Sequence, residues 1–144
     1  MHPVPDALTW LAGGWLVQRE VRDLASGDEG AFTGRTEFTA RPPDAGLLHH
    51  ESGAFTWQDA TRPAERTLLY VPGAVPGTID VRFADGRPFH DLDLRTGRHR
   101  THHPCAADRY DGEFTVTGPD AFRTVWRVGG PAKDLLLVTE YRRA

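Results

Sequence analysis

Residues 78–94 have the sequence TIDVRFADGRPFHDLDL, which indicates two strands joined by a tight turn. Three apolar residues of the first half alternate with polar ones, as on a half-buried strand: Ile79, Val81 and Phe83. The pair Asp85-Gly86 follows, and Asp-Gly favours hairpin turns because both positions must adopt positive φ. The returning half places three residues on one face: His90, Leu92 and Leu94. The stretch therefore predicts a β-hairpin with strands 78–83 and 88–94.

The same alternation recurs along the rest of the chain, between 15 Gly and 11 Pro residues that are spread over its whole length. Further strands are expected at 15–24, 31–41, 47–57, 66–71, 113–117, 122–128 and 135–142. Residues 99–110 show no clear period and are expected to form an irregular connection. We predict an all-β fold, an up-and-down antiparallel barrel of about nine or ten strands, because closure removes exposed sheet edges. An open sandwich is the alternative.

One short helix is expected before the first strand, at residues 6–12. Asp6 can cap its N-terminus, and Leu8 and Leu11 lie three residues apart on one face. Gly13-Gly14 ends it. A helix this short is marginal alone, so it must pack on the barrel.

Length and charge limit the function classes. With 144 residues the chain has the size of one domain, and residues 1–144 are interpreted as a single barrel. The net charge of −3 offers no basic face for nucleic acid, and no apolar run is long enough to span a membrane. One cysteine, Cys105, excludes an intramolecular disulfide. The start lacks a secretory signal pattern, so a soluble cytoplasmic protein is expected.

Gly13-Gly14-Trp15, which follows the short helix and opens the first strand, resembles the Gly-x-Trp start of lipocalin-type barrels. The resemblance implies that Trp15 packs across one barrel end beneath a basic residue of the last strand. Arg142 or Arg143 can supply that residue.

A second resemblance covers nearly the whole chain. The segments that carry it are LAGGW (11–15) with Arg19, HESG (50–53), FADGRPFH (83–90), HPCAADRYDG (103–112) and WRVGGPAKD (126–134). The chain resembles a family of small bacterial proteins of unknown function with a lipocalin-like (calycin) β-barrel. This family implies a fold and no chemistry. Haem-binding nitrobindin-type barrels share the Gly-x-Trp opening, but their further glycine pattern and proximal histidine segment have no clear match, so no cofactor is predicted.

His90 is the first candidate for chemistry. If the face that it shares with Leu92 and Leu94 lines the lumen, its imidazole points inward among apolar neighbours. Such a group can orient a ligand or transfer a proton. A structural histidine that bonds a neighbouring strand is an equally good interpretation.

The second candidate is the polar segment around the single cysteine: His99, His102, His103, Cys105, Asp108 and Tyr110. Its residue types suit a metal, but the spacing matches no zinc pattern and only one thiolate is present. Alternatively, Cys105 is a catalytic nucleophile that His103 activates. A loop held by side-chain hydrogen bonds is favoured, and no metal site is predicted.

Glu51 is the third candidate, because a carboxylate inside a barrel can pair with Arg66 or Arg87 or act as a general base. An outward, solvated Glu51 is equally compatible with the sequence.

Trp126 and Tyr141 are expected to be core or lumen-wall aromatics. The predicted ligand-binding set is His90, Glu51, Arg87, Tyr70, His103, Cys105, Tyr110 and Trp126.

Three functions remain open from the sequence. The first is a binding module that holds a partly apolar small molecule in the lumen. The second is a small enzyme, such as a cyclase, isomerase or hydrolase, that uses His90 with Glu51 or Asp108 for proton transfer. The third is a metal or haem protein that uses histidines and Cys105. A homodimer through an uncovered strand is a further possibility.

Overall fold

The computed structural model describes residues 1–42 and 44–144, and antiparallel strands make up most of it. One short helix, α1 (Ala7–Leu11), precedes the strands. The strands are β1 (Gly13–Asp23), β2 (Glu29–Ala40), β3 (Leu47–Trp57), β4 (Ala60–Pro72), β5 (Ile79–Phe83), β6 (Pro88–Leu92), β7 (Arg98–Cys105), β8 (Asp108–Gly118), β9 (Ala121–Gly130) and β10 (Lys133–Arg143).

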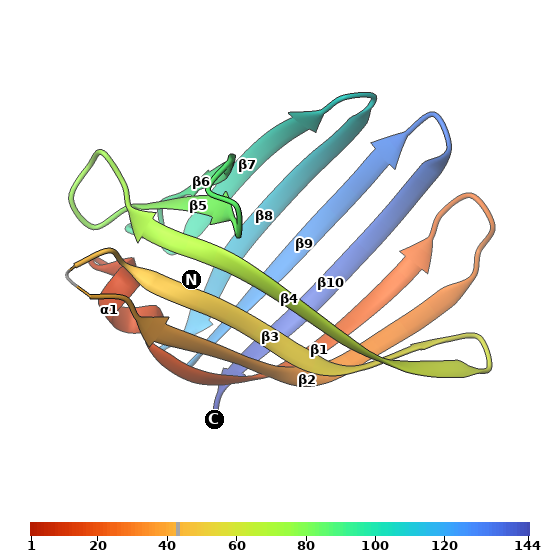
Figure 1. The fold of residues 1–144 in the computed structure, drawn as a ribbon, viewed down its shortest axis with the longest axis horizontal. Coiled ribbons are helices and arrows are strands. Elements are labelled where there is room, and N and C mark those ends of the chain that lie inside the picture. The colour runs from red at the N-terminus through yellow and green to blue at the C-terminus, as the bar shows by residue number, and fades with distance from the viewer. Residues whose placement is uncertain (43) are drawn as a thin grey trace.

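The strands form one ten-stranded sheet in the order β6-β5-β4-β3-β2-β1-β10-β9-β8-β7. Pairing of β1 with β10 joins the two halves of this sheet, and the sheet curls so that its edge strands approach each other (Figure 1). The two edge strands, β6 and β7, lie beside each other and are linked through Asp91 of β6. Its carboxylate accepts a hydrogen bond from the Thr101 hydroxyl at 2.9 Å, and its carbonyl lies 3.2 Å from His99 Nε2. The predicted up-and-down barrel is confirmed, nearly closed and with ten strands.

Helix α1 packs against the core, as expected, and it closes one end of the barrel. The Asp6 carboxylate caps it by accepting a 3.5 Å hydrogen bond from the Thr9 backbone N–H, and it also accepts a 2.8 Å hydrogen bond from the Thr9 hydroxyl. Its inner face is apolar and buried, together with the preceding segment: Val4, Ala7 and Leu11. In Figure 1, α1 lies at one end of the strands, and the β7–β8 and β9–β10 hairpin loops lie at the other.

Trp15 is completely buried beneath this helix, where the Gly-x-Trp resemblance placed it. The Arg143 guanidinium lies 4.3 Å from the Trp15 ring centroid and donates a 2.9 Å hydrogen bond to the Trp10 carbonyl. Arg143, rather than Arg142, therefore supplies the basic residue over the tryptophan. The cation and the two indole rings seal this end by packing and cation–π attraction.

The prediction of an irregular connection at residues 99–110 is wrong. This segment forms β7 and the start of β8, joined by a tight turn in which Ala106 has a φ of 55°. The alternation is hidden because both faces of β7 carry polar residues: those of the inner face contact Asp91 of β6, and those of the outer face pair with β8. His102 contacts the Asp111 carboxylate at 2.6 Å, and Arg98 lies 3.0 Å from Glu113. An edge strand with one solvated face does not need an apolar stripe.

Strand β4 is longer than the sequence indicates. It begins at Ala60, whereas the alternation pointed to residue 66. Its first half is exposed and pairs with the end of β3 on one side only, because β5 begins to pair with β4 at Leu68. A strand that buries neither face carries no hydrophobic period, so this part escaped detection.

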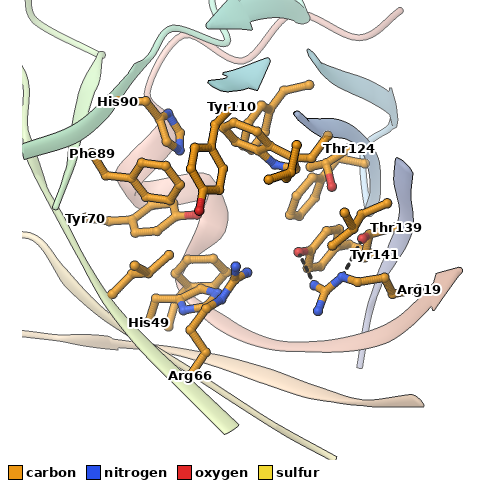
Figure 2. A pocket seen from close by; sticks show the side chains of 17 residues that line it. Arg19, His49, Arg66, Tyr70, Phe89, His90, Tyr110, Thr124, Thr139 and Tyr141 are labelled. Carbon is orange, nitrogen blue, oxygen red and sulfur yellow. Dashed lines mark hydrogen bonds between the residues drawn. The ribbon is translucent and has the colours of Figure 1, made fainter. Parts of the chain in front are cut away.

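Strand β6 contains a bulge. His90 pairs with Val81, but Pro88 pairs with Arg82, so Phe89 is an extra residue with no partner of its own. A bulge re-aims the side chains around it. Strict alternation would direct Phe89 outward, opposite to His90, yet both side chains line the lumen (Figure 2).

Within residues 1–42 and 44–144, no helix combines the length and the apolar character that crossing a lipid bilayer requires.

Candidate functional site

The barrel contains a cavity with a volume of about 110 Å³. Its walls are mainly aromatic and include Tyr70, Phe89, Tyr110, Phe114, Phe122 and Trp126. Figure 2 shows the labelled side chains around a central space, with His90 and Tyr110 on one side and His49 and Arg66 on the opposite side. The cavity has room for several waters or one compact organic molecule.

Trp126 forms a large part of the wall, and a glycine permits its position. Its ring lies over Gly112, the partner of Trp126 in the β8–β9 pairing. A Cβ atom at position 112 would lie 2.6 Å from the ring. Phe89 stacks on the other side, with ring centroids 5.6 Å apart and planes at 24°. The bulge of β6 and a small residue in β8 together build this aromatic wall.

Arg19 and Glu51 form a buried ion pair beside the cavity. Arg19 Nη1 donates to Glu51 Oε1 at 2.7 Å, and Nη2 donates to Oε2 at 3.0 Å. The remaining Arg19 donors also have partners, because Nε donates to the Thr139 hydroxyl at 2.8 Å and Nη2 lies 3.2 Å from the Tyr141 hydroxyl. The Thr36 hydroxyl donates to Glu51 Oε2 at 3.1 Å. This bidentate pair is well satisfied.

The ion pair holds both partners in their charged forms. Burial by itself raises the pKa of Glu51, but the Arg19 hydrogen bonds and the charges of Arg66 and Arg19 lower it to about 2. Burial by itself lowers the pKa of Arg19, but Tyr141 and Glu51 raise it above its ordinary value. Glu51 is therefore a poor general base, because a carboxylate with so low a pKa binds a proton weakly.

Arg66 is the second cation of the cavity. It faces Glu51 across the β3–β4 pairing, and its Nη2 atom lies 3.9 Å from Glu51 Oε1. This distance is too long for a hydrogen bond. The Arg66 side chain is 48% exposed, against 12% for Arg19. Arg66 therefore lies where the cavity meets solvent.

His90 lies on the opposite wall with one ring nitrogen engaged. Its Nδ1 atom is 2.6 Å from the Asp91 carbonyl, which can only accept, so Nδ1 carries the hydrogen. Burial lowers the pKa of His90 to about 4. The ring is then neutral at pH 7 and its Nε2 atom keeps a free lone pair, which can accept a hydrogen bond from a ligand.

His49 is the most deeply buried polar ring of the site. It stacks on Tyr70 at 5.4 Å and meets Phe38 edge-on at 5.2 Å. Burial, with a contribution from the Arg66 charge, lowers the pKa of His49 to about 3, so it too is neutral. In the described part of the chain, its Nδ1 atom is buried without a hydrogen-bond partner. An unpaired buried polar atom is uncommon in native structures.

Residues 11–143 match the model of a family of unknown function, DUF6314. The match covers almost the whole chain. The chain belongs to this family. The resemblance found in the sequence, to a family of unknown function with a lipocalin-like barrel, is thereby confirmed. No curated protein matches the chain in sequence.

Solved structures similar to this DUF6314 member support the barrel fold. The S-type phycobiliprotein lyase CPES from Guillardia theta superimposes with a TM-score of 0.67 at 10% identity, covering 99% of this chain and 93% of that one. A protein of unknown function from the DUF3598 family of Nostoc punctiforme has a TM-score of 0.66 at 12% identity. The DUF6314 chain is covered over 99% of its length but spans only 51% of that protein. At such identities the likeness concerns the fold alone.

Several predicted site residues of the DUF6314 chain meet at the cavity. The residues that line it are His90, Tyr70, Tyr110 and Trp126. Glu51 lies behind Arg19, inside the barrel, which excludes the outward alternative. His103 lies at the edge of the aromatic cluster, with its ring centroid 5.2 Å from that of Phe89.

Three other predicted residues lie elsewhere on the barrel. Arg87 is exposed and pairs with Asp85 in the β5–β6 turn at 2.7 Å. Cys105 is an exposed free thiol. Asp108 pairs with Lys133 at 2.9 Å, which ties the β7–β8 turn to the start of β10. The structure therefore does not bring these three residues to the cavity.

The acid–base pair of the enzyme alternative, His90 with Glu51 or Asp108, is also not formed. His90 contacts the Asp91 carbonyl, Glu51 contacts Arg19, and Asp108 contacts Lys133. Among residues 1–42 and 44–144, no group of three or more His, Cys, Asp or Glu side chains is arranged to hold a metal ion. These observations give no support to the enzyme alternative or to the metal-protein alternative.

Sequence reasoning missed two residues of the site, although a signal for both existed. Arg19 alternates with Trp15 and Val17, which are buried, so its position in β1 directs it inward. His49 alternates with the buried Leu47 in β3. Both were overlooked because polar residues on a core-facing register are usually interpreted as surface positions.

Proposed function

We propose that the barrel binds a compact, partly apolar small molecule in its lumen. The observation that carries this proposal is the aromatic cavity of about 110 Å³ with polar groups on opposite walls. Concave, mostly apolar sites with a few fixed polar groups are typical of ligand pockets.

The ligand of this proposal is small. Ligand pockets for drug-sized molecules have volumes of roughly 300–1,000 Å³, larger than this cavity. The floor consists of Phe38, Phe122 and Tyr141, which pack toward the end closed by α1. A one-ring or compact two-ring molecule fits these limits, with its ring against Phe89 and Trp126 and a polar group near His90 or Arg66.

A cavity-filling substitution tests the proposal. Val128 lines the cavity from β9, so Val128→Phe directs a larger side chain into the space. The neighbouring Val125 faces the outer surface, so Val125→Phe adds the same volume outside the barrel. We expect the neutral probes benzamide and 2-naphthamide to bind the unmodified protein saturably at one site, measured by NMR titration and by fluorescence.

Val128→Phe should weaken this binding by roughly tenfold or more, because overpacked side chains leave no room for the ring. Val125→Phe should bind as the unmodified protein does. Thermal unfolding of each variant shows whether the barrel is intact. Equal binding by both variants would contradict the proposal, and so would the absence of saturable binding for these amides and for the corresponding carboxylate, 2-naphthoate.

A further inference from the structure

The cavity carries an unbalanced positive charge. Arg19 and Arg66 are cations, and both line it. Glu51, which contacts both, is the only carboxylate within 4.0 Å of either guanidinium in the described part of the chain. The two buried imidazoles add no charge at pH 7, because burial lowers the pKa of His49 to about 3 and that of His90 to about 4. Two cations against one carboxylate leave one positive charge.

The geometry shows which cation is left over. Arg19 uses both of its terminal nitrogens on the two Glu51 oxygens, at 2.7 and 3.0 Å. Arg66 is 3.9 Å from the same carboxylate and approaches Oε1, which Arg19 already occupies. The guanidinium fork of Arg66 is therefore available to another acceptor.

Arg66 also has the right place for a ligand contact. On β4 it shares the inward face with Leu68 and Tyr70, which are buried, while its own side chain is half exposed. Figure 2 shows Arg66 across the cavity from His90 and Tyr110. A molecule whose ring lies among the aromatic side chains can thus direct a terminal group toward Arg66.

We propose that the ligand is a compact aromatic monocarboxylate whose carboxylate is bound by Arg66 at the cavity mouth. This inference rests on the proposed small-molecule binding and names its chemical class. A planar carboxylate matches the guanidinium fork with two parallel hydrogen bonds. One negative charge balances the site, whereas a cationic ligand would meet an excess of positive charge in a poorly solvated space.

The test compares two probes of nearly equal shape, 2-naphthoate and 2-naphthamide, on the unmodified protein. The carboxylate should bind roughly tenfold to a hundredfold more tightly than the amide, the range expected for a charge-assisted pair. This preference should shrink as salt is added, because Arg66 is half exposed and its charge is screened. The affinity for the amide should respond little to salt.

Substitutions at Arg66 locate the contact. Arg66→Gln should reduce the preference for 2-naphthoate to a few-fold or less and leave 2-naphthamide affinity close to its original value. Arg66→Lys keeps the charge without the fork and should retain part of the preference. The control is Arg35→Gln, which removes an equally exposed arginine from the outer face of β2, where it pairs with Glu37. That variant should keep the full preference.

The outcomes separate this inference from the proposed function. If both probes bind the unmodified protein equally, or if Arg66→Gln keeps the preference, the carboxylate inference is overturned while lumen binding stands. If neither probe binds, the proposed function itself fails. Salt titration of the unmodified protein decides the question without any variant, should Arg66→Gln fold poorly.

Discussion

Arg19 and Glu51 meet inside the barrel although they are 32 residues apart in sequence. Each would be costly to bury alone, since an unpaired charge in a core destabilises the fold by several kcal/mol. Together they satisfy one another, and Thr36, Thr139 and Tyr141 take up the remaining hydrogen-bonding groups. The consequence for the site is that Arg66, and not Arg19, is the cation free to contact a ligand.

The two neutral histidines make stability depend on pH in a defined direction. In the unfolded chain the pKa of His90 is near 6.5, and in the fold it is about 4. Between these values the unfolded state binds more protons, so stability is full above pH 6.5 and falls as the pH decreases toward 4. His49, whose folded pKa is about 3, acts in the same direction.

Replacing His90 should flatten this profile. With His90→Phe, we expect the slope of unfolding free energy against pH between 6.5 and 5 to decrease by up to about 1.4 kcal/mol per pH unit, the contribution of one proton. Urea unfolding at a series of pH values measures it. Phe114→Leu, a non-titrating change in the same wall, should lower stability without changing the slope. An unchanged slope in His90→Phe would contradict a neutral, buried His90.

At the scale of elements, β6 and β7 differ from the other strands. Each is an edge of the sheet, and β6 carries the bulge that brings Phe89 into the lumen. The two edges are held together by the Asp91 side chain and carbonyl, which contact Thr101 and His99. A seam made of side-chain hydrogen bonds is weaker than a backbone ladder, so it is the place where the barrel opens most easily.

The seam can be tested by removing its bridging carboxylate. Asp91→Ala should speed amide hydrogen exchange in β6 and β7, while global stability changes by no more than about 1 kcal/mol, because the Asp91 side chain is 77% exposed. Asp111→Ala is the matched control, since Asp111 pairs with His102 within the β7–β8 hairpin and does not reach β6. If exchange in β6 were equally fast in both variants, the Asp91 bridge would not be what closes the barrel.

The two ends of the barrel differ. One end is sealed, and the cavity lies toward the other. Helix α1, Trp15 and the Arg143 guanidinium seal the first end. The cavity lies beyond them and is lined by Leu137, Tyr110 and Val128, of which Tyr110 begins β8 and Val128 is near the end of β9. The β7–β8 and β9–β10 hairpin loops lie away from α1 (Figure 1). A ligand would therefore enter from the side opposite the helix.

The sealed end should carry much of the stability of the barrel. Leu11 is 1% exposed and joins α1 to the core, so Leu11→Ala should lower the unfolding free energy by about 2–5 kcal/mol through lost burial and a cavity. Leu16→Ala, at a position 41% exposed on the outer face of β1, should change it by about 0.5 kcal/mol or less. Chemical denaturation measures both. Similar losses in the two variants would show that α1 does not hold the barrel end.

The sequence by itself determined the all-β class, the short capped helix and the up-and-down barrel, and it placed His90 on one strand face with Leu92 and Leu94. These features follow from local patterns, because alternation, turn residues and caps act between neighbours in the chain. The sequence did not predict the polar hairpin at 99–110 or the exposed half of β4 as strands, because strands with solvated faces need no apolar stripe.

Only the tertiary structure decided which side chains meet at the cavity. The partner of Glu51 depends on how the sheet places β1 and β3 on either side of β2, so that Arg19 and Glu51 meet over its inner face, and Phe89 enters the lumen only because β6 bulges. The tertiary structure also decided that Arg87, Cys105 and Asp108 lie away from the cavity, in or beside the β5–β6 and β7–β8 turns. Register and curvature arise from the pairing of whole strands, so contacts between distant strands leave no trace in a local period.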